Sequence, residues 1–375
     1  MQDMARWWDS ANAVTAVIDY MSVTGDRSYL EAAVENTFAR APRTRRPVHA
    51  RRISLSAPYL RLHNAVYKGF INGYYDDEGW WALAWVGAYD LTGDERYLAA
   101  ADDVFQDMVG GWDDYWGGGI YWGKHDGSPD RAGITAVPRG WKGGYKNAIA
   151  NQLFIAAAAS LGLRYRRRSP SGAHYANYLQ WARRGWEWFS SPPPRGVAMI
   201  NEADLVNDSP DMQGVNNNTE DVWSYNQGVI LGGLCDLEEL AGDETYLGRA
   251  QKIADAFIEN PWSGDRSFRP RASGVISGIL HELDDCNPDG SALSAVPSVD
   301  GTLFKGIFVR NLARLYLKTR KAAYRQFILT NAQSALAHMN QHYQFGCNWA
   351  APVDVADFVR QTAALDLVNA ALLVA

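Results

Sequence analysis

The chain alternates between two kinds of apolar pattern, and both are helical. Residues 80–91 are apolar at nearly every position, which is typical of a helix surrounded by protein on all sides. Residues 95–109 instead carry apolar side chains along one stripe and polar side chains opposite, which is typical of a helix with one wet face. Residues 244–259 repeat this second pattern, and strand-like alternation is nearly absent. The sequence therefore predicts an all-α fold of paired helices.

A short turn motif separates the two helix types and recurs along the chain. Residues 25–30, 93–98 and 242–247 each begin with Gly-Asp and end with Tyr-Leu, and residues 319–324 form a degenerate fourth copy. Glycine can end a helix in the left-handed conformation, and the aspartate after it can cap the start of the next helix. Each copy therefore predicts a helical hairpin.

The hairpins place six buried helices and five amphipathic helices along the chain. Inner helices are expected near residues 5–23, 78–92, 145–162, 224–241, 303–318 and 355–374, and outer helices near 27–39, 95–109, 172–190, 244–259 and 321–341. Inner and outer helices that alternate around a ring form an (α/α)6 toroid. Because the chain begins in an inner helix, we expect that the N-terminal outer helix of this toroid is absent from the sequence. Residues 1–375 are expected to form a single domain, since no linker or low-complexity run divides them.

The composition excludes several classes of function. The chain of 375 residues is 47% hydrophobic with a net charge of −6, so it can bury one large core but offers no basic surface for nucleic acid. The basic stretch at residues 40–52 lacks interleaved aromatic side chains and is interpreted as a solvated loop. No run of about eighteen apolar residues predicts a membrane span, and residues 1–9 do not resemble a signal peptide. Residues missing upstream would hide such a peptide, so the sequence leaves localisation open.

Cysteine and tryptophan usage indicate what the chain binds. Cys235, Cys286 and Cys347 are too scattered for a disulfide framework or a metal cluster, and no metal-binding motif is complete. We therefore expect no metal and no cofactor. In contrast, 15 Trp and 19 Tyr exceed the needs of a core of this size. Flat aromatic side chains stack well on the apolar faces of sugar rings, which favours a carbohydrate ligand.

Two adjacent aspartates, Asp76 and Asp77, stand directly before a buried helix. Unpaired backbone N–H groups at a helix start favour negative charge, whereas mutual repulsion and the surrounding aromatic side chains raise one pKa of the pair. Glycosidic bond cleavage requires such a pair, with one acid ionised and the other protonated. The alternative is that one aspartate only caps the helix.

Six strings of residues around these positions carry a family resemblance. The strings are residues 76–84, 110–122, 146–148, 223–228, 304–308 and 361–365. In these strings and their order, the chain from Trp7 to its C-terminus resembles glycoside hydrolase family 76, the endo-α-1,6-mannanases. The resemblance implies an endo-acting, retaining hydrolase of α-1,6-linked mannan on an (α/α)6 barrel, with Asp76 as nucleophile and Asp77 as acid/base. It also suggests secretion, and we expect a monomer.

The remaining motif residues are candidate substrate contacts. These contacts are Trp8, Asn12, Trp80, Trp122, Asn147, Asp221, Trp223, Tyr225, Asn226 and Lys305. Trp8 and Asn12 lie one helical turn apart and can face the same cleft. Trp122 follows a glycine run and is expected to stack on a mannose ring, with core packing as the alternative.

Several of these contacts have structural alternatives. Asn147, Tyr225 and Asn226 lie near helix starts, where they either orient sugar hydroxyls or cap the helix. Lys305 either binds a sugar hydroxyl or forms a salt bridge with Asp300.

Other functions stay open at this stage. Glu220 and Asp221 form a reserve acid pair in case Asp76 and Asp77 are structural. A transglycosidase at the same site, another sugar-active enzyme on the same fold and a glycan-binding protein without turnover are the alternatives. The seven histidines avoid the expected inner helices, which argues against a sugar epimerase. The sequence does not separate hydrolysis from transfer.

Overall fold

The computed structural model describes residues 7–40, 69–124, 146–170, 172–210, 221–264, 271–283, 285–287, 291 and 300–375. Helices make up most of these residues. The inner helices are α1 (Trp7–Thr24), α3 (Tyr75–Thr92), α5 (Ala148–Arg168), α7 (Ser224–Ala241), α9 (Gly301–Thr319) and α11 (Phe358–Val374). The outer elements are the π-helix η2 (Leu30–Glu35) with α2 (Asn36–Ala39), then α4 (Glu95–Gly110), α6 (Ala173–Ser190), α8 (Thr245–Glu259) and α10 (Ala322–His338).

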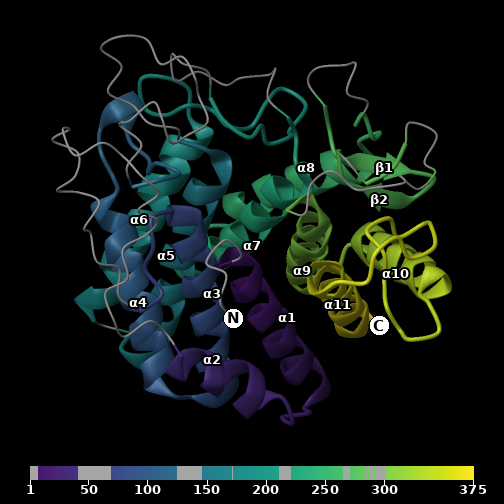
Figure 1. The fold of residues 1–375 in the computed structure, drawn as a ribbon. Coiled ribbons are helices and arrows are strands. Elements are labelled where there is room, and N and C mark those ends of the chain that lie inside the picture. The colour runs from purple at the N-terminus through teal and green to yellow at the C-terminus, as the bar shows by residue number, and fades with distance from the viewer. Residues whose placement is uncertain are drawn as a thin grey trace, which may run out of the picture.

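The inner helices form a closed ring (Figure 1). Each packs against the next inner helix along the chain, and α11 returns to α1. At that junction the Nδ2 of Asn369 donates a hydrogen bond to the carbonyl of Ala16 at 2.8 Å. Each outer element packs against the inner helix that precedes it. The predicted (α/α)6 arrangement is confirmed, with six inner and five outer members among the described residues.

The repeated Gly-Asp turn has the predicted geometry. Gly93 and Gly242 end α3 and α7 in the left-handed conformation, with φ of 73° and 67°. The Asp94 carboxylate accepts the amide of Arg96 at the start of α4, and Asp243 makes the corresponding bond before α8. The hairpins therefore follow from local sequence.

Close contacts between inner helices explain two glycines. A Cβ at Gly228 would lie 2.6 Å from the Cα of Phe308, and one at Gly306 would lie 2.7 Å from the Cα of Ala363. These distances are too short for a side chain, so α9 meets both α7 and α11 backbone to backbone. Residues 148–163 of α5 are all buried, as expected for an inner helix.

The structure adds detail that the sequence did not predict. The first outer helix, expected at residues 27–39, is divided into η2 and α2. An antiparallel hairpin of β1 (Gly274–Ile276) and β2 (Ile279–His281) precedes α9. The long loops expected to build the site, and most of the basic stretch at residues 40–52, lie partly or wholly outside the described residues. No helix in the described part of the chain is long and apolar enough to cross a membrane.

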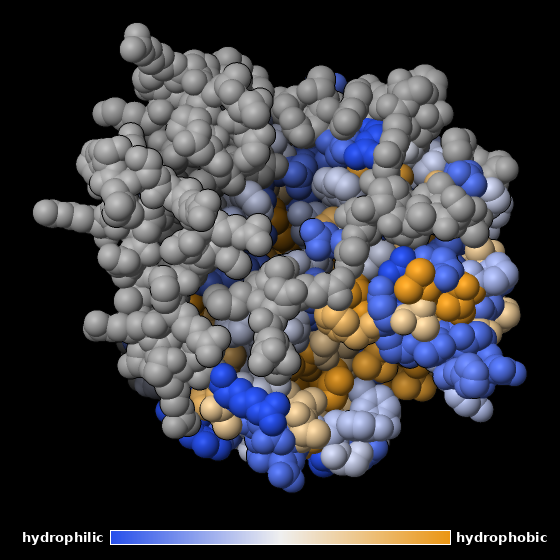
Figure 2. All heavy atoms as spheres, viewed as in Figure 1, coloured by the Kyte–Doolittle hydropathy of each residue, from blue (hydrophilic) through white to orange (hydrophobic). Residues whose placement is uncertain are grey.

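Figure 2 shows apolar surface over α10 and α11. The exposed large apolar side chains of these two helices include Leu336, Phe358 and Leu372. Hydrophilic residues prevail elsewhere on the described part of this face, as expected for helices with one wet side.

Candidate active site

The aspartate pair lies at the end of the ring where the inner helices begin. Asp76 and Asp77 occupy the first turn of α3. The N–H groups of a first turn lack helical partners, and the helix dipole favours negative charge there. Other carboxylates converge on this point. The charge of Asp208 acts on Asp76, and those of Asp9 and Asp300 act on Asp77.

Asp76 is held by one donor on each oxygen. Its Oδ2 accepts the indole N–H of Trp122 at 2.8 Å, and its Oδ1 accepts the amide of Asp77 at 2.9 Å. Burial raises the pKa of Asp76 to about 6, although both hydrogen bonds favour the ionised form. The carboxylate is therefore fixed in orientation and ionised near neutral pH.

Asp77 is the more strongly perturbed acid. Burial is the main cause that raises its pKa well above the ordinary value, and the negative charge of Asp76 is the second. The side-chain amide of Asn72 donates a hydrogen bond to Oδ2 of Asp77 at 2.5 Å, which opposes this rise in pKa only in part. Asp77 therefore keeps its proton at a pH where Asp76 is ionised. Since Tyr74 occupies the N-cap of α3, neither aspartate has the capping role that the sequence left as an alternative.

A buried polar chain supports Asn72 from behind. The side-chain Oδ1 of Asn72 accepts a hydrogen bond from the backbone N–H of Tyr74 at 2.8 Å. The backbone N–H of Asn72 donates to the Glu78 carboxylate at 2.9 Å. Glu78 is fully buried and pairs with Lys124, which also pairs with Asp107. Sequence reasoning missed Asn72, Glu78 and Lys124. The available signal was a glutamate inside the otherwise aromatic and apolar start of α3.

An aromatic cluster gathers the starts of α1, α3, α7 and α9. The Phe304 ring stacks on Tyr225 with centroids 3.7 Å apart, and it lies 5.9 Å from Trp8 and 5.5 Å from Trp223. Trp80, one turn after the aspartates, lies 6.2 Å from Trp8. Trp8, Trp223 and Tyr225 are partly exposed, whereas Trp80 and Phe304 are buried. The structure thus brings four predicted contacts together around Phe304, which sequence reasoning missed.

Trp122 has a role that its type alone did not reveal. The side chain is partly exposed, its ring lies 4.9 Å from that of Tyr74, and its N–H is committed to Asp76. The indole therefore orients the Asp76 carboxylate. Its stacking on a sugar ring stays a prediction.

Two other predicted contacts lie beneath the surface. Asn12 is fully buried, where it donates to the carbonyl of Trp8 at 3.1 Å and accepts from Arg310 at 2.7 Å. Asn147 is buried as the N-cap of α5, where its side chain accepts the amide of Ala150 at 3.2 Å. Asn12 therefore supports Trp8 from below, and the capping alternative describes Asn147.

Asn226 connects the start of α7 to the surroundings of the aspartate pair. Its Nδ2 donates to Asp208 at 2.8 Å, and the Asp208 carbonyl accepts the amide of Ala148 at 2.7 Å. Asp208 in turn contributes negative charge to Asp76. Sequence reasoning missed Asp208, which lies in a loop with no recognisable motif.

Lys305 is part of the core. Its ammonium is fully buried, pairs with Asp285, donates to the Cys347 carbonyl at 2.6 Å and lies 4.6 Å from the centre of the Trp349 ring. The salt bridge suggested with Asp300 is thus made with Asp285. This geometry favours a structural role and disfavours a sugar contact.

Asp221 forms a buried ion pair. Its carboxylate accepts from Arg271 at 2.6 Å, and that guanidinium lies 5.9 Å from the centre of the Trp223 ring. Glu220, the other member of the reserve acid pair, lies outside the described residues. Asp221 therefore acts as a support for Trp223.

One buried cluster has the residue types of a metal site. Ligand atoms of His281, Asp285 and Cys286 lie within 4.8 Å of one another. Asp285 already accepts from Lys305 and lies 3.1 Å from the Nδ1 of His281. An ammonium beside the carboxylate opposes a second cation, so these residues fit a hydrogen-bonded cluster better than a metal centre.

Comparison with known proteins agrees with this arrangement. The sequence pattern of glycosyl hydrolase family 76 matches residues 1–375. The mannan endo-1,6-alpha-mannosidase DFG5 of Candida albicans is 26% identical over 335 residues, which cover 79% of this chain and 65% of the relative. DFG5 of Saccharomyces cerevisiae is 24% identical over 293 residues, with coverage of 73% and 54%. The chain thus spans between half and two thirds of the length of these relatives.

Solved structures share the fold. An inactive variant of the alpha-1,6-mannanase GH76A of Salegentibacter sp. HEL1_6, with two consecutive aspartates replaced by asparagine and alpha-1,6-mannotriose bound, superposes with a TM-score of 0.69 at 22% identity over 98% of this chain and 90% of that one. Dfg5 from Chaetomium thermophilum in complex with glucosamine gives 0.68 at 19% identity, with coverage of 98% and 80%. From the match along its whole length, this chain belongs to glycosyl hydrolase family 76.

Proposed function

We propose that the protein hydrolyses α-1,6-mannosidic bonds within mannan and retains the anomeric configuration. One observation carries the proposal: Asp76 and Asp77 share the first turn of α3 and have unequal proton affinities. Membership of the family and the names of the curated relatives support the choice of substrate.

The unequal pair divides the two chemical tasks. Asp76, ionised near neutral pH, attacks the anomeric carbon and forms a covalent glycosyl-enzyme. Asp77, still protonated, gives its proton to the departing glycosidic oxygen. In the second step the Asp77 carboxylate takes a proton from water, and that water releases the sugar from Asp76 with net retention.

The surrounding residues keep this division fixed. Trp122 donates to Asp76 and favours its ionised form, which keeps the nucleophile ready. Asn72 holds Asp77 and is itself locked by Glu78. The partly exposed rings of Trp8, Trp223 and Tyr225 would receive mannose rings next to the pair, because aromatic faces complement the C–H faces of sugars.

Digestion of linear α-1,6-mannan tests the proposal. We expect short mannooligosaccharides, and proton NMR of the first products should show the α-anomer before mutarotation. Asp103→Asn, a change on the exposed face of α4, is the matched control and should cleave at the wild-type rate. The proposal is rejected if wild-type protein leaves the mannan intact or if the β-anomer forms first.

Transfer to a sugar acceptor is the second candidate. The similarity of fold to a Dfg5 with glucosamine bound favours it, because that complex places an amino sugar on a related scaffold. In transfer, a sugar hydroxyl replaces water in the second step. Adding a glucosamine-containing oligosaccharide to the digestion and analysing the products by mass spectrometry separates the two, since transfer yields an acceptor that carries extra mannose.

We further propose that the chain acts as one catalytic domain and as a monomer. The continuous ring from α1 to α11 supports the first point, because its closure requires both ends of the described chain. Sedimentation equilibrium should give a mass near the 41.6 kDa of the chain, and twice that mass would contradict the second point.

A further inference from the structure

A cavity lies inside the ring, at the end opposite the aspartate pair. Its volume is about 330 Å³, and all six inner helices line it. Trp80 and Arg310 line it, and Trp80 also lies beside Trp8 of the aromatic cluster in the candidate active site. At the other end Ser22 and Asp90 are exposed, so the cavity opens where the inner helices finish.

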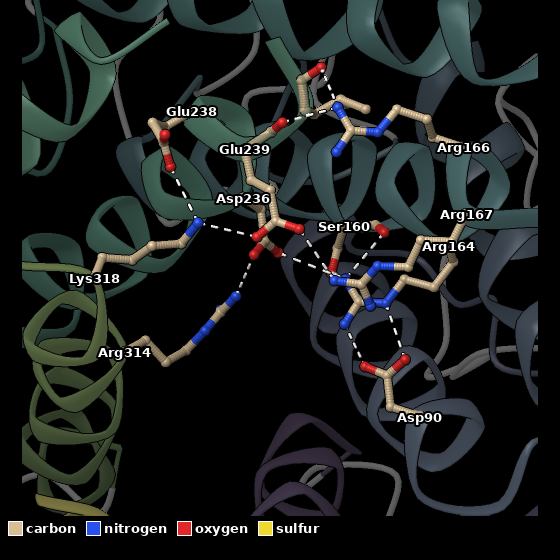
Figure 3. A network of polar contacts seen from close by, with 11 residues as sticks. Asp90, Ser160, Arg164, Arg166, Arg167, Asp236, Glu238, Glu239, Arg314 and Lys318 are labelled. Carbon is tan, nitrogen blue, oxygen red and sulfur yellow. Dashed lines mark hydrogen bonds and ion pairs between the residues drawn. The ribbon is translucent and has the colours of Figure 1, made fainter. Parts of the chain in front are cut away.

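The arginines along this cavity are already neutralised. Arg164 pairs with Asp90 and lies 3.9 Å from Asp236, and Arg314 pairs with Asp236 at 2.6 Å (Figure 3). Deeper in the cavity, Arg310 pairs with a separate acid, Asp366, at 3.2 Å. An anionic ligand would therefore have to compete with carboxylates already in place.

Asp19 differs from these acids. Its side chain lines the cavity and makes no hydrogen bond or ion pair with any residue in the described part of the chain. Burial raises its pKa, and the positive charges of Arg310 and Arg314 act in the opposite direction. The same two guanidinium groups would repel a cation bound at Asp19. The position therefore suits a neutral hydrogen-bond donor.

Another part of the cavity wall is apolar. Ile18, Leu83, Ala84 and Val229 line it, and they come from three different inner helices. A ligand that fits must offer both hydroxyl groups and C–H groups. Its size is limited by the volume of the cavity, which is at the lower end of small-molecule pockets.

We propose that this cavity is a binding site for a neutral polyhydroxylated molecule the size of one hexose, separate from the catalytic cleft. Hydroxyl groups of the ligand donate to Asp19 and accept from the guanidinium of Arg314, and the sugar C–H face packs on the apolar wall. A free monosaccharide would enter from the end where the inner helices finish. The site does not depend on the reaction proposed for Asp76 and Asp77.

Filling the cavity provides the test. Gly87 lines it, and a Cβ there would meet only the Cγ2 of Ile18, at 3.4 Å, so Gly87→Leu places a side chain in the cavity. Gly248→Leu on α8 is the matched control, because a Cβ there meets nothing within 4 Å. Both changes replace a helical glycine by the same residue, so their effects on helix propensity are alike.

D-Mannose is the probe. Potassium chloride and sodium phosphate are soaked in separately, to test whether the cavity binds a cation or an anion instead. Crystals soaked in mannose should show one hexose within hydrogen-bond distance of Asp19, in addition to any sugar in the cleft. Gly87→Leu should abolish this density and reduce the calorimetric stoichiometry by one, while Gly248→Leu changes neither. If Gly87→Leu fails to fold, Asp19→Asn should weaken mannose binding in the cavity by about tenfold.

Three outcomes would overturn the inference. They are a cavity that holds only water at saturating mannose, a stoichiometry that Gly87→Leu leaves unchanged, and density for potassium or phosphate without density for mannose. Mannan cleavage, measured separately, reports only on the aspartate pair. Failure of one proposal therefore leaves the other intact.

Discussion

The two ends of the inner ring hold charged groups in opposite ways. At the end where the helices begin, the structure gathers carboxylates, namely Asp9, Asp76, Asp77, Asp208 and Asp300. At the end where they finish, cations and acids neutralise one another in ion pairs: Arg164 with Asp90, Arg314 with Asp236 and Lys318 with Glu238 (Figure 3). Helices that run in one direction around a ring align their dipoles, so negative charge is favoured at one end and positive charge at the other.

The partners of each acid decide whether it can titrate. Asp77 is half-buried and Asp236 is buried, yet the pKa of Asp77 is raised and that of Asp236 is lowered. Burial raises both pKa values, but the charges of Arg314 and Arg164 outweigh burial at Asp236. Among the described residues, Asp77 has only the neutral side-chain amide of Asn72 as a donor. Neutral donors leave an acid able to hold a proton. At Asp236 the cationic partners remove that ability and produce a structural ion pair.

The largest effect is expected at the catalytic end. Asp76→Asn should lower kcat/KM on α-1,6-mannan by at least about 10³-fold, because it removes the proposed nucleophile. The fold should persist, since the change removes a buried charge beside Asp77. Initial rates and circular dichroism measure the two properties. A loss of less than about tenfold would place the nucleophile elsewhere.

At the end where the inner helices finish, replacing an aspartate by asparagine should lower stability and leave activity unchanged. Asp236→Asn leaves Arg314 and Arg164 without their shared acid and should lower the free energy of unfolding by about 3 kcal/mol, with kcat unchanged. Urea denaturation measures this loss, and Asp103→Asn serves as the control for a change of one surface charge. A variant with wild-type stability but reduced kcat would contradict the division between the two ends.

A smaller change should move the pH profile. Trp122→Phe removes the N–H that stabilises ionised Asp76, so the pKa of Asp76 should rise above about 6 and the acid limb of kcat/KM should move to higher pH by about one unit. The acid limb moves to higher pH because activity requires the ionised form of Asp76, and a higher pKa means that this form appears only at higher pH. A shift to lower pH would show that the indole favours the protonated form.

The smallest effect is expected for the outermost ion pair. Lys318 is about one third exposed and pairs with Glu238 and Glu239 near 3 Å. Lys318→Gln should cost less than about 1 kcal/mol in free energy of unfolding, because solvent and salt screen such pairs. Denaturation at low and high salt checks this. A loss equal to that of Asp236→Asn would show that exposure does not separate the two pairs.

Local sequence predicted the scaffold and placed the two adjacent aspartates at the start of an inner helix. The Gly-Asp turns at Gly93 and Gly242 encode the hairpins within a few residues, and the fully apolar helices can only be inner ones. The six motif strings supplied the family and the position of Asp76 and Asp77. These features were accessible because each depends on neighbours in the chain.

The residues that hold the aspartate pair in place could not be predicted from local sequence. Asn72 reaches Asp77 only because Glu78 and Lys124 fix it, and Lys124 comes from a loop beyond α4. Lys305 was predicted either to bind a sugar hydroxyl or to pair with Asp300, but its partner is Asp285, which lies in a separate loop. Side-chain type shows what a group can do, and its partners decide what it does.

The sequence by itself determined the helical hairpins, the ring that they build and the presence of two adjacent acids, because helix periodicity and capping are local. Only the tertiary structure decided which acid keeps its proton, which tryptophan orients a carboxylate and which polar residues are structural. Burial and electrostatic interaction depend on groups that the fold brings together from distant parts of the chain.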